Sequence, residues 1–463
     1  MKTTDNCKTA SYDIFSTQAP GLPRGNKGAE FLKFIGSQST KSMRPVLLPM
    51  ALTAMSAYAN GITFVYCDNK SYELCGEMCH LIASSGVGKG QWTSLCNVIM
   101  RGFVEHDKGE YERLAEWQRQ TKRKGANSQK PERPDIAIWF PPADMTNPAF
   151  IQNAMAMEKC GNRTQYLNLS EVEYANKLCG GHRQVSMMVR NIYDVQRAGA
   201  LRVSADGVSG NPVLRVNMTF SSTPEAARDF YRRDMTNGFF GRIPFAFKAR
   251  EARVGRVPRQ GEFSEGFVNT LQGYINILSN AEGSNIVVKP LNKVIDELAA
   301  EMATVADLAD DDMLFELSHR SIFAAWKKGC VLWLLNNRVW TKNIGDYVKW
   351  FAYSDLWGKV QVFGDMLHTS ISERKGGPKN MLDDLPEAFT MQQLEALRES
   401  LEKNPAGARH QTEVWKNRGF VVFDADKQLF CKTKEYLKGK KKSNYDEVKK
   451  HLQSLEKKQE EII

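Results

Sequence analysis

Residues 77–91 read EMCHLIASSGVGKGQ. An apolar run with strand character, 77–83, leads into a glycine-containing loop, and residues 91–103 have helical character. Between a strand and a helix N-terminus, the backbone N–H groups of such a loop can cradle phosphate oxygens. Glycines permit the positive φ angles and close backbone approach that this needs, and a lysine neutralises phosphate charge. The stretch therefore predicts a loop that binds the phosphates of a nucleotide.

The loop departs from the usual phosphate-loop pattern at two positions. Ala83 stands at the first glycine position, which is a mild change. Gly90 stands where a Ser or Thr hydroxyl usually ligates Mg²⁺, so the metal would need water or a carboxylate from elsewhere. Nucleotide kinases similar to adenylate kinase also have glycine there, so the pattern supports nucleotide binding more directly than hydrolysis. The predicted nucleotide-binding residues are Ser84, Ser85, Gly86, Val87, Gly88, Lys89, Gly90 and Gln91.

The segments around the loop predict a mainly parallel sheet. Runs of β-branched and aromatic residues predict strands, and helical stretches rather than tight hairpins separate them, which is typical of βα units. Residues 260–370 are predicted to be helical, with no proline between Pro290 and Pro378. The predicted strands are 62–66, 77–83, 135–140, 164–169, 215–220 and 243–247.

Carboxylates are expected near the bound phosphates, because ligands of a parallel sheet bind outside the carboxyl ends of its strands. Asp144 follows the predicted strand 135–140, and Glu171 and Glu173 follow the predicted strand 164–169. Glu171 ends its strand directly and is the first choice for the catalytic and Mg²⁺-holding carboxylate, with Asp144 second. Surface or helix-capping roles are the alternatives for both.

Two further features could contact the γ-phosphate. Ser222 or Thr223, after the predicted strand 215–220, could act as a sensor. Arg242 precedes the predicted strand 243–247 and could act as an arginine finger, within its own chain or toward a neighbouring subunit. A structural ion pair is the alternative for Arg242.

The order of these motifs resembles the RecA-like helicase- and primase-associated P-loop ATPases of plasmids, phages and mobilisable elements. The resemblance implies a RecA-type sheet, ATP and Mg²⁺ as cofactors, DNA as a partner, and a homo-oligomer that could be a ring. Ser170 stands where this family places an Asp before the acid, and Ser170 and Gly90 both weaken the implied ATPase activity. The matching stretches are 83–90, 144–146, 167–173, 222–224 and 238–245.

Residues 381–433 predict a separate module without reference to any family. Thr390 caps a helix, a turn follows at 404–407, a second helix covers 408–417, and residues 420–432 form a hairpin. Helix, turn, helix and two-stranded wing is the winged-helix arrangement, which can read DNA or contact proteins. The predicted DNA-contacting residues are Arg409, His410, Gln411, Thr412 and Lys416.

Charge favours an anionic partner. The 463 residues have a net charge of +10, which points to nucleic acid. The charged stretches 105–133 and 434–463, the latter with basic residues 438–442, predict exposed helices that are either solvated faces or phosphate contacts.

Cysteine usage and hydropathy predict a cytoplasmic protein. The nine cysteines are odd in number and scattered, which is typical of free thiols, and no apolar run is long enough for a membrane helix. Cys67, Cys75, Cys79 and His80 lie close together, but they lack CxxC spacing, and a buried strand is preferred to a metal site.

The predicted fold class is α/β: a RecA-like P-loop domain with a mainly parallel sheet, followed by a helical region and a C-terminal winged helix. The leading functional hypothesis is an ATP-hydrolysing, helicase-like protein acting on DNA in replication, excision or mobilisation of a mobile element. The alternatives are a DNA-binding assembly factor with a degenerate, non-hydrolysing nucleotide site and, third, a small-molecule or nucleotide kinase. The predicted boundaries are an N-terminal arm and helix at 1–60, the P-loop domain at 61–255, the helical domain at 256–380, the winged helix at 381–433 and a charged tail helix at 434–463.

Overall fold

The computed structural model describes residues 13–14, 16–23, 30–124, 129, 131–161, 163–179, 182–202, 207–232, 238–249, 262–309, 311–373, 381–401 and 403–437. Within these ranges the chain forms two compact units. The first contains 19–296 and 320–358, and the second contains 13–18, 297–319 and residues from 359 onward. Residues 256–380 therefore contribute to both units. Of the predicted charged tail helix at 434–463, residues 438–463 lie outside the described residues.

The main sheet of the first unit is parallel, as the sequence predicts. It contains β3 (Met78–Ile82), β4 (Gln165–Leu169), β5 (Val216–Ser222) and β6 (Phe245–Phe247), in the order β4-β5-β3-β6. Every residue of β3 and β5 is buried. Burial on both faces fits the largely apolar sequence of β3, whereas β5 alternates Val216, Met218 and Phe220 with buried polar residues.

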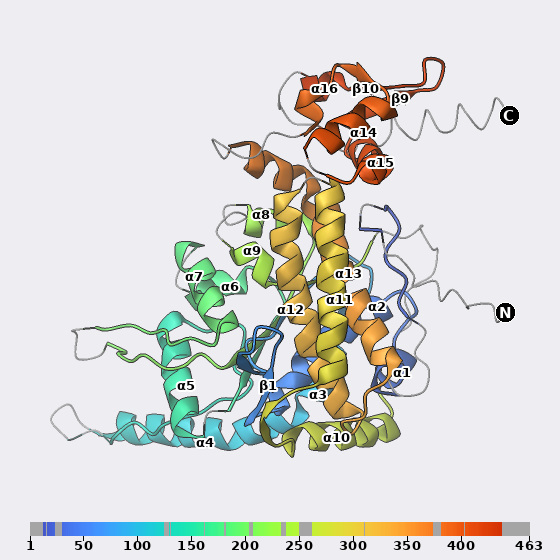
Figure 1. The fold of residues 1–463 in the computed structure, drawn as a ribbon. Helices are drawn as coiled ribbons and strands as arrows, with labels where there is room; N and C mark the ends of the chain where they lie inside the picture. Colours follow the sequence, from blue (N-terminus) through green and yellow to red (C-terminus); the bar gives the residue numbers. More distant parts are fainter. Residues whose placement is uncertain are drawn as a thin grey trace, which may run out of the picture. The chain divides into compact units, whose positions relative to one another are not determined.

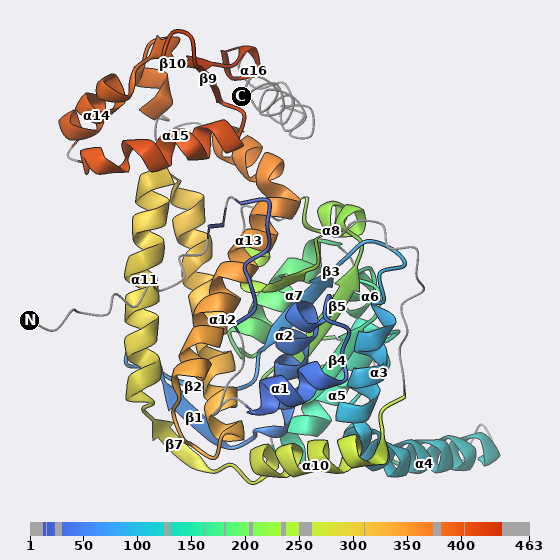
Figure 2. The same ribbon diagram turned by 90° about the vertical axis from the view of Figure 1, so that its right-hand side faces the viewer.

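Helices pack on both faces of this sheet. Figure 2 shows α2 (Arg44–Met55) and α3 (Gly90–Ile99), which share one face. On their face, Asn217 of β5 donates to the Ser56 hydroxyl at the start of η1 (Ser56–Tyr58), 2.9 Å away. The opposite face meets α8 (Pro224–Tyr231) and α9 (Phe239–Arg242), which bring Tyr231 and Phe240 against Phe245. The first unit is therefore an α/β structure.

The predicted strand 62–66 belongs to a second, smaller sheet and not to the main parallel sheet. β1 (Ile62–Val65) pairs antiparallel with β2 (Ser71–Glu73) and parallel with β7 (Gly283–Ile286), and it is not part of the main sheet. Asn69, at φ 62°, lies in the turn between β1 and β2. β2 and β7 are short, polar and half-exposed, so they have no apolar pattern that would have predicted them.

The predicted strand 135–140 is wrong, because side chains take up most of its backbone N–H groups. Asp107, on α4 (Arg101–Arg123), accepts from Trp139 N and Phe140 N, both at 2.8 Å. Asn153, on α5 (Asn147–Lys159), accepts from Ile138 N at 2.8 Å. Only one backbone bond, from Tyr166 N to Trp139 O at 2.8 Å, connects this segment to β4 in the described residues. An apolar run can therefore lie beside a sheet without joining its ladder.

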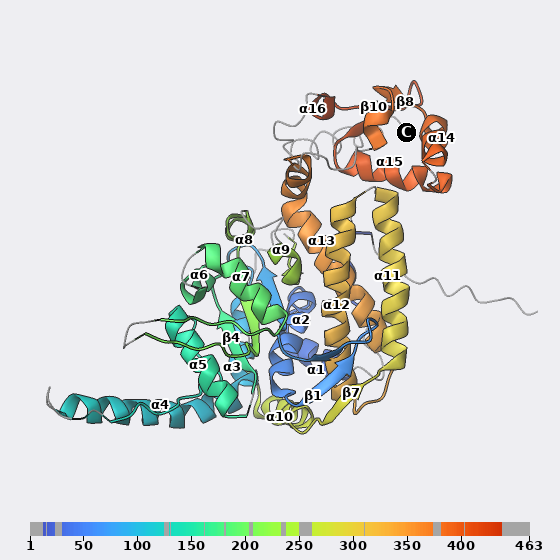
Figure 3. The same ribbon diagram turned by 60° about the vertical axis from the view of Figure 1, so that its left-hand side comes forward.

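The predicted helical character of residues 260–370 is confirmed for 265–279, 289–309, 312–335 and 342–373, and β7 interrupts it. α4 is also long, and Figure 3 shows it projecting beyond the rest of the first unit. Among the described residues, no helix is long and apolar enough to cross a membrane. The remaining helices (Figure 1) are α1 (Glu30–Ser37), α6 (Tyr174–Cys179), α7 (His182–Tyr193), α10 (Glu265–Ser279), α11 (Lys289–Ala309), α12 (Asp312–Leu335), α13 (Lys342–Glu373) and α16 (Lys434–Leu437).

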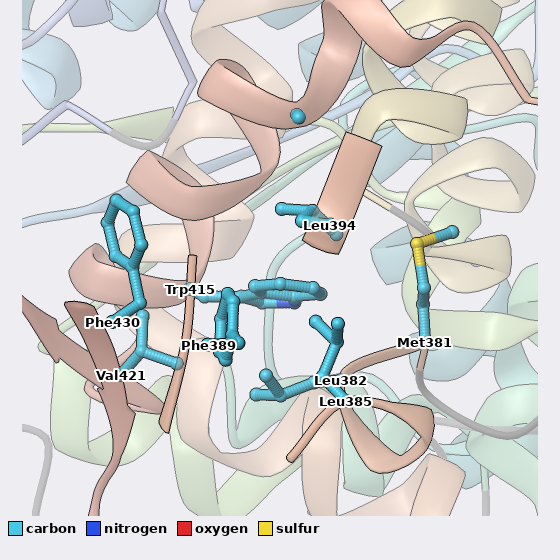
Figure 4. Close-up of a cluster of buried hydrophobic side chains, with 9 residues drawn as sticks. Met381, Leu382, Leu385, Phe389, Leu394, Trp415, Val421 and Phe430 are labelled. Atoms are coloured by element: carbon cyan, nitrogen blue, oxygen red, sulfur yellow. The ribbon is translucent and has the colours of Figure 1, made fainter. Parts of the chain in front are cut away.

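The end of the second unit contains the predicted order of helix, turn, helix and hairpin. Thr390 caps α14 (Met391–Ser400) in a capping box with Gln393, as the Thr390 signal predicts. Phe389, Leu394 and Trp415 lie in a shared apolar core (Figure 4). β8 was not predicted, because two residues are too few to show a pattern. The other elements are η2 (Met381–Asp384), β8 (Ala388–Phe389), η3 (Pro405–Gly407), α15 (Ala408–Asn417), β9 (Val421–Asp424) and β10 (Leu429–Lys432), with the sheet order β8-β10-β9.

Candidate nucleotide-binding site

The glycine-containing loop lies between a buried strand and a helix N-terminus, as its sequence predicts. It leaves the carboxyl end of β3 at Ala83, and α3 begins at Gly90. Gly86 and Gly88 have φ angles of 76° and 94°. In this left-handed region a residue with a Cβ costs about 1–2 kcal/mol. The two glycines are therefore required by the loop backbone itself.

The side-chain ammonium of Lys89, the residue before α3, is held by two main-chain carbonyls. Its Nζ donates to Ala83 O at 3.1 Å and to Ser222 O at 3.2 Å. These oxygens belong to the carboxyl ends of neighbouring strands, β3 and β5. Burial lowers the pKa of Lys89, while the charges of Glu171 and Glu225 raise it. A partly desolvated ammonium therefore lies between the carboxyl ends of β3 and β5.

The other loop residues differ in their access to a ligand. Ser85, Gly86 and Gly90 are exposed, and Ser84, Val87 and Gly88 are half-buried. Gln91 is buried, and its side chain is bonded to Thr40, both to the hydroxyl at 3.2 Å and to the backbone N at 3.3 Å. The side chain of Gln91 thus connects α3 to the segment before α2, a role that its sequence position did not indicate.

Two carboxylates lie near Lys89, and only one of them was predicted. Glu171 lies two residues after the end of β4 and is exposed, and its charge acts on Lys89. Glu225, in the first turn of α8, does the same. Asp144 is exposed in the loop before α5. Glu225 could have been found by the reasoning applied to Glu171, because it comes three residues after the end of β5.

A second cation at this edge of the sheet was also missed. Lys248 directly follows β6, is buried, and donates its backbone N–H to Ile82 O at 2.9 Å. The strand-end rule that selects Glu171 would have selected this lysine too.

Ser222 is placed behind the loop rather than inside it, which corrects its predicted role as a direct phosphate sensor. Its side chain is fully buried, and its hydroxyl donates to Thr223 O at 3.0 Å and lies 2.8 Å from His80 Nε2. Thr223 is half-buried, and its hydroxyl caps α8 by accepting from Ala226 N at 3.2 Å. Ser222 therefore acts on the loop through its carbonyl, which receives Lys89.

His80 lies at the core of this arrangement. It is fully buried on β3, and its Nδ1 is 2.9 Å from the Tyr231 hydroxyl. Burial, with a smaller contribution from the Lys89 charge, lowers the pKa of His80 from 6.5 to about 3. His80 is therefore an uncharged imidazole at neutral pH.

This uncharged histidine predicts a loss of stability in acid. The unfolded chain binds a proton at His80 near pH 6.5 but the folded protein does not until about pH 3, so the free energy of unfolding falls as pH drops through this window. We expect His80→Gln to reduce that slope by about 1.4 kcal/mol per pH unit between pH 6 and pH 4.5. Urea denaturation at each pH measures it, and identical slopes for the variant and the wild type would contradict it.

Arg242 lies at the opposite edge of the sheet from the glycine-containing loop. The prediction that it acts as an arginine finger within its own chain is therefore wrong. It precedes β6, whose carboxyl end, Phe247, pairs with Ile82 beside the loop. Its guanidinium forms an ion pair with Asp194 at 3.1 Å and lies over the Tyr193 ring. The structural ion pair that was the alternative interpretation is present.

The cysteines near β3 form no metal site in the part of the chain that the structure describes, where no cluster of metal-ligating side chains occurs. Cys67, Cys75 and Cys79 are not in disulfide bonds. His80 uses both ring nitrogens in hydrogen bonds. The predicted buried strand is confirmed for Cys79 and His80, which belong to β3, while Cys67 and Cys75 lie outside the strands.

The predicted DNA-contacting helix, α15, presents fewer polar side chains than its sequence suggests. Gln411 and Thr412 are 0% and 1% exposed, which removes them from the predicted contact set. Gln411 accepts from the buried Arg398 guanidinium, and that bond connects α15 to α14. Arg409 is exposed, His410 is half-buried, and Lys416 pairs with Glu413 at 3.0 Å.

No protein-family model matches the chain, and no curated protein is significantly similar to it. The resemblance to RecA-like ATPases therefore stays a prediction from motifs. What the chain does has to be inferred from its own geometry, above all from Lys89 and the strand ends around it.

Proposed function

We propose that the protein binds ATP through residues 83–90 and uses it in work on DNA, as a helicase-like ATPase. The observation that carries the proposal is the position of Lys89, whose ammonium is held by Ala83 O and Ser222 O at the start of a ten-residue helix. Gly86 and Gly88 supply positive φ angles, which a loop with convergent N–H groups requires.

The residues fit a polyphosphate. The N-terminus of α3 presents its positive dipole end, and Lys89 adds a full charge. Burial already weakens the hydration of Lys89, so an anion that replaces its two carbonyl partners gains a strong, charge-assisted hydrogen bond.

Mg²⁺ fits less closely, because Gly90 has no hydroxyl to ligate it. Glu171 and Glu225 are the two acids whose charges reach Lys89, and they would hold the ion, directly or through water. When bound, Mg²⁺ would neutralise phosphate charge. Glu171, at the end of β4, is the proposed residue that orients the attacking water.

DNA is the proposed partner on the basis of charge and module order. The net charge is +10, and the helix-turn-helix and hairpin order at 388–432 is compatible with a winged helix. Arg409 is the exposed cation on α15. A ring-shaped homo-oligomer remains part of the proposal, and in it Arg242 could serve only a neighbouring subunit, after leaving Asp194.

A second function is favoured by Gly90: a DNA-binding assembly factor that binds nucleotide without hydrolysing it. The two proposals differ in turnover. The first expects ATP hydrolysis that DNA stimulates, and the second expects ATP binding with no hydrolysis above background in the presence or absence of DNA.

The acids allow a sharper test. We expect Glu171→Gln to lower kcat at least about 100-fold with a small change in KM, because a water-orienting carboxylate acts in the transition state. Glu173→Gln, an exposed acid two residues away, is the matched control and should keep nearly full activity. ATPase assays with single-stranded, double-stranded and no DNA measure both. If Glu225→Gln and not Glu171→Gln is inactive, the catalytic role moves to Glu225.

A further inference from the structure

A buried chain of three polar side chains runs from α8 to the back of the phosphate loop. Tyr231 contacts His80 at 2.9 Å, and His80 contacts Ser222 at 2.8 Å. The residues come from α8, β3 and β5 respectively, and all three are fully or almost fully buried. None of them touches the space in front of Lys89, so the proposed function leaves this chain unexplained.

The directions of these hydrogen bonds follow from proton count. Ser222 has one hydroxyl proton, which it donates to Thr223 O at 3.0 Å. His80 must then donate from Nε2 to the Ser222 oxygen, and its Nδ1 must accept from the Tyr231 hydroxyl. The bond to Ser222 therefore sets the tautomer of the imidazole, and the Tyr231 hydroxyl donates to the ring nitrogen that is left.

The chain ends on the peptide that holds the lysine. Ser222 O accepts from Lys89 Nζ at 3.2 Å and from Ala83 N at 3.1 Å. The Ser222 hydroxyl is bonded to His80 on one side and to Thr223 O on the other. These two bonds restrict the Ser222 side chain, and with it the Ser222 carbonyl of the same residue.

We propose that His80 is a positioning residue for the phosphate loop: acting through Ser222, it holds the carbonyl that sets the resting place of the Lys89 ammonium and anchors Ala83. The proposal rests on the proposed function in one respect, that the loop so positioned receives a nucleotide. A histidine that only fills space is the alternative, and Phe220, Phe245 and Tyr231 surround its ring at 5.7, 5.8 and 5.7 Å between centroids. An aromatic replacement would satisfy that alternative.

Four variants of the full chain separate the two. His80→Phe keeps an aromatic ring and removes both hydrogen bonds. His80→Gln places an amide N–H near the original Nε2 and serves as the rescue. Ser222→Ala removes the hydroxyl while keeping the carbonyl, and Tyr231→Phe removes only the far hydroxyl and is the matched control.

The first readout needs no nucleotide. In the free protein, acetylation of Lys89 by an amine-reactive ester and amide exchange of the peptide containing Ala83 are followed by mass spectrometry. We expect both rates to rise about three- to tenfold in His80→Phe and in Ser222→Ala, the effect of losing one hydrogen bond. His80→Gln and Tyr231→Phe should stay within about twofold of the wild type. If His80→Phe does not fold, Ser222→Ala against Tyr231→Phe decides the question.

The second readout is ATP affinity by calorimetry. We expect His80→Phe to bind about tenfold more weakly and His80→Gln to recover most of that loss. Wild-type rates in His80→Phe and Ser222→Ala, or equal increases in Tyr231→Phe, would overturn the proposal. A wild type that binds no ATP would instead overturn the proposed function, while the nucleotide-free rates would still decide the role of His80.

Discussion

Replacing Lys328 by methionine is expected to lower the free energy of unfolding by about 3–5 kcal/mol, the cost of breaking a buried ion pair by removing one partner. Lys328 Nζ lies 2.7 Å from Glu77 Oε2, and the two side chains are 1% and 4% exposed. Lys328 also donates to the Thr53 hydroxyl at 2.9 Å. Methionine keeps the volume of the side chain but leaves the Glu77 carboxylate buried without its cation, directly before β3.

Urea denaturation followed by tryptophan fluorescence measures this change. Lys342→Met is the matched control: it breaks an exposed pair with Asp346, also at 2.7 Å, and should cost at most about 0.5 kcal/mol. Adding Glu77→Gln to Lys328→Met removes the stranded charge and should recover a large part of the loss. A loss in Lys328→Met no greater than in Lys342→Met would show that the buried pair does not support β3.

Lys89→Ala is expected to weaken ATP binding at least about 100-fold, or about 2.7 kcal/mol. The substitution removes the charge that would meet the phosphates and also the contacts to Ala83 O and Ser222 O that close the loop. A charge-assisted hydrogen bond and the positive charge at a helix N-terminus together account for a loss of this size.

Calorimetric titration with ATP measures this loss. The matched control is Lys122→Ala, an exposed lysine near the end of α4, which should bind ATP as the wild type does. Far-ultraviolet circular dichroism of both variants shows whether they are folded. Wild-type affinity in a folded Lys89→Ala would mean that the loop does not bind phosphate.

Local patterns predicted the elements near the loop well. The apolar run before Ala83, the glycines and the following helix are all local signals, and the structure has β3, the loop and α3 in that order. The capping box at Thr390 is equally local. Where one residue type at one position decides the conformation, the local sequence is sufficient to predict that conformation.

Pairing and burial were predicted less well, because they depend on residues far away in the chain. Nothing in residues 62–66 shows that β1 pairs with β7, more than 200 positions later in the chain. Gln411 looks like a surface residue until Arg398 reaches it from α14. The edge on which Arg242 lies depends on the direction of β6 relative to β3.

The site was predicted in part for the same reason. Glu171 lies two residues after β4, and the strand-end rule selected it as a site candidate. His80 was interpreted as a core residue, and its two partners come 142 and 151 positions later in the chain. No local pattern connects these positions, so the polar chain behind Lys89 became visible only in three dimensions.

The most direct test of the proposed nucleotide site is hydrogen exchange of the full chain with and without ATP. We expect ATP to slow amide exchange most strongly in the peptide that covers residues 83–91, because phosphate oxygens would accept from the N–H groups of the loop and the start of α3. The slowing should be absent in Lys89→Ala. Saturating ATP that leaves the exchange of residues 83–91 unchanged, or that protects only other peptides, would contradict the assignment of this loop as the nucleotide site.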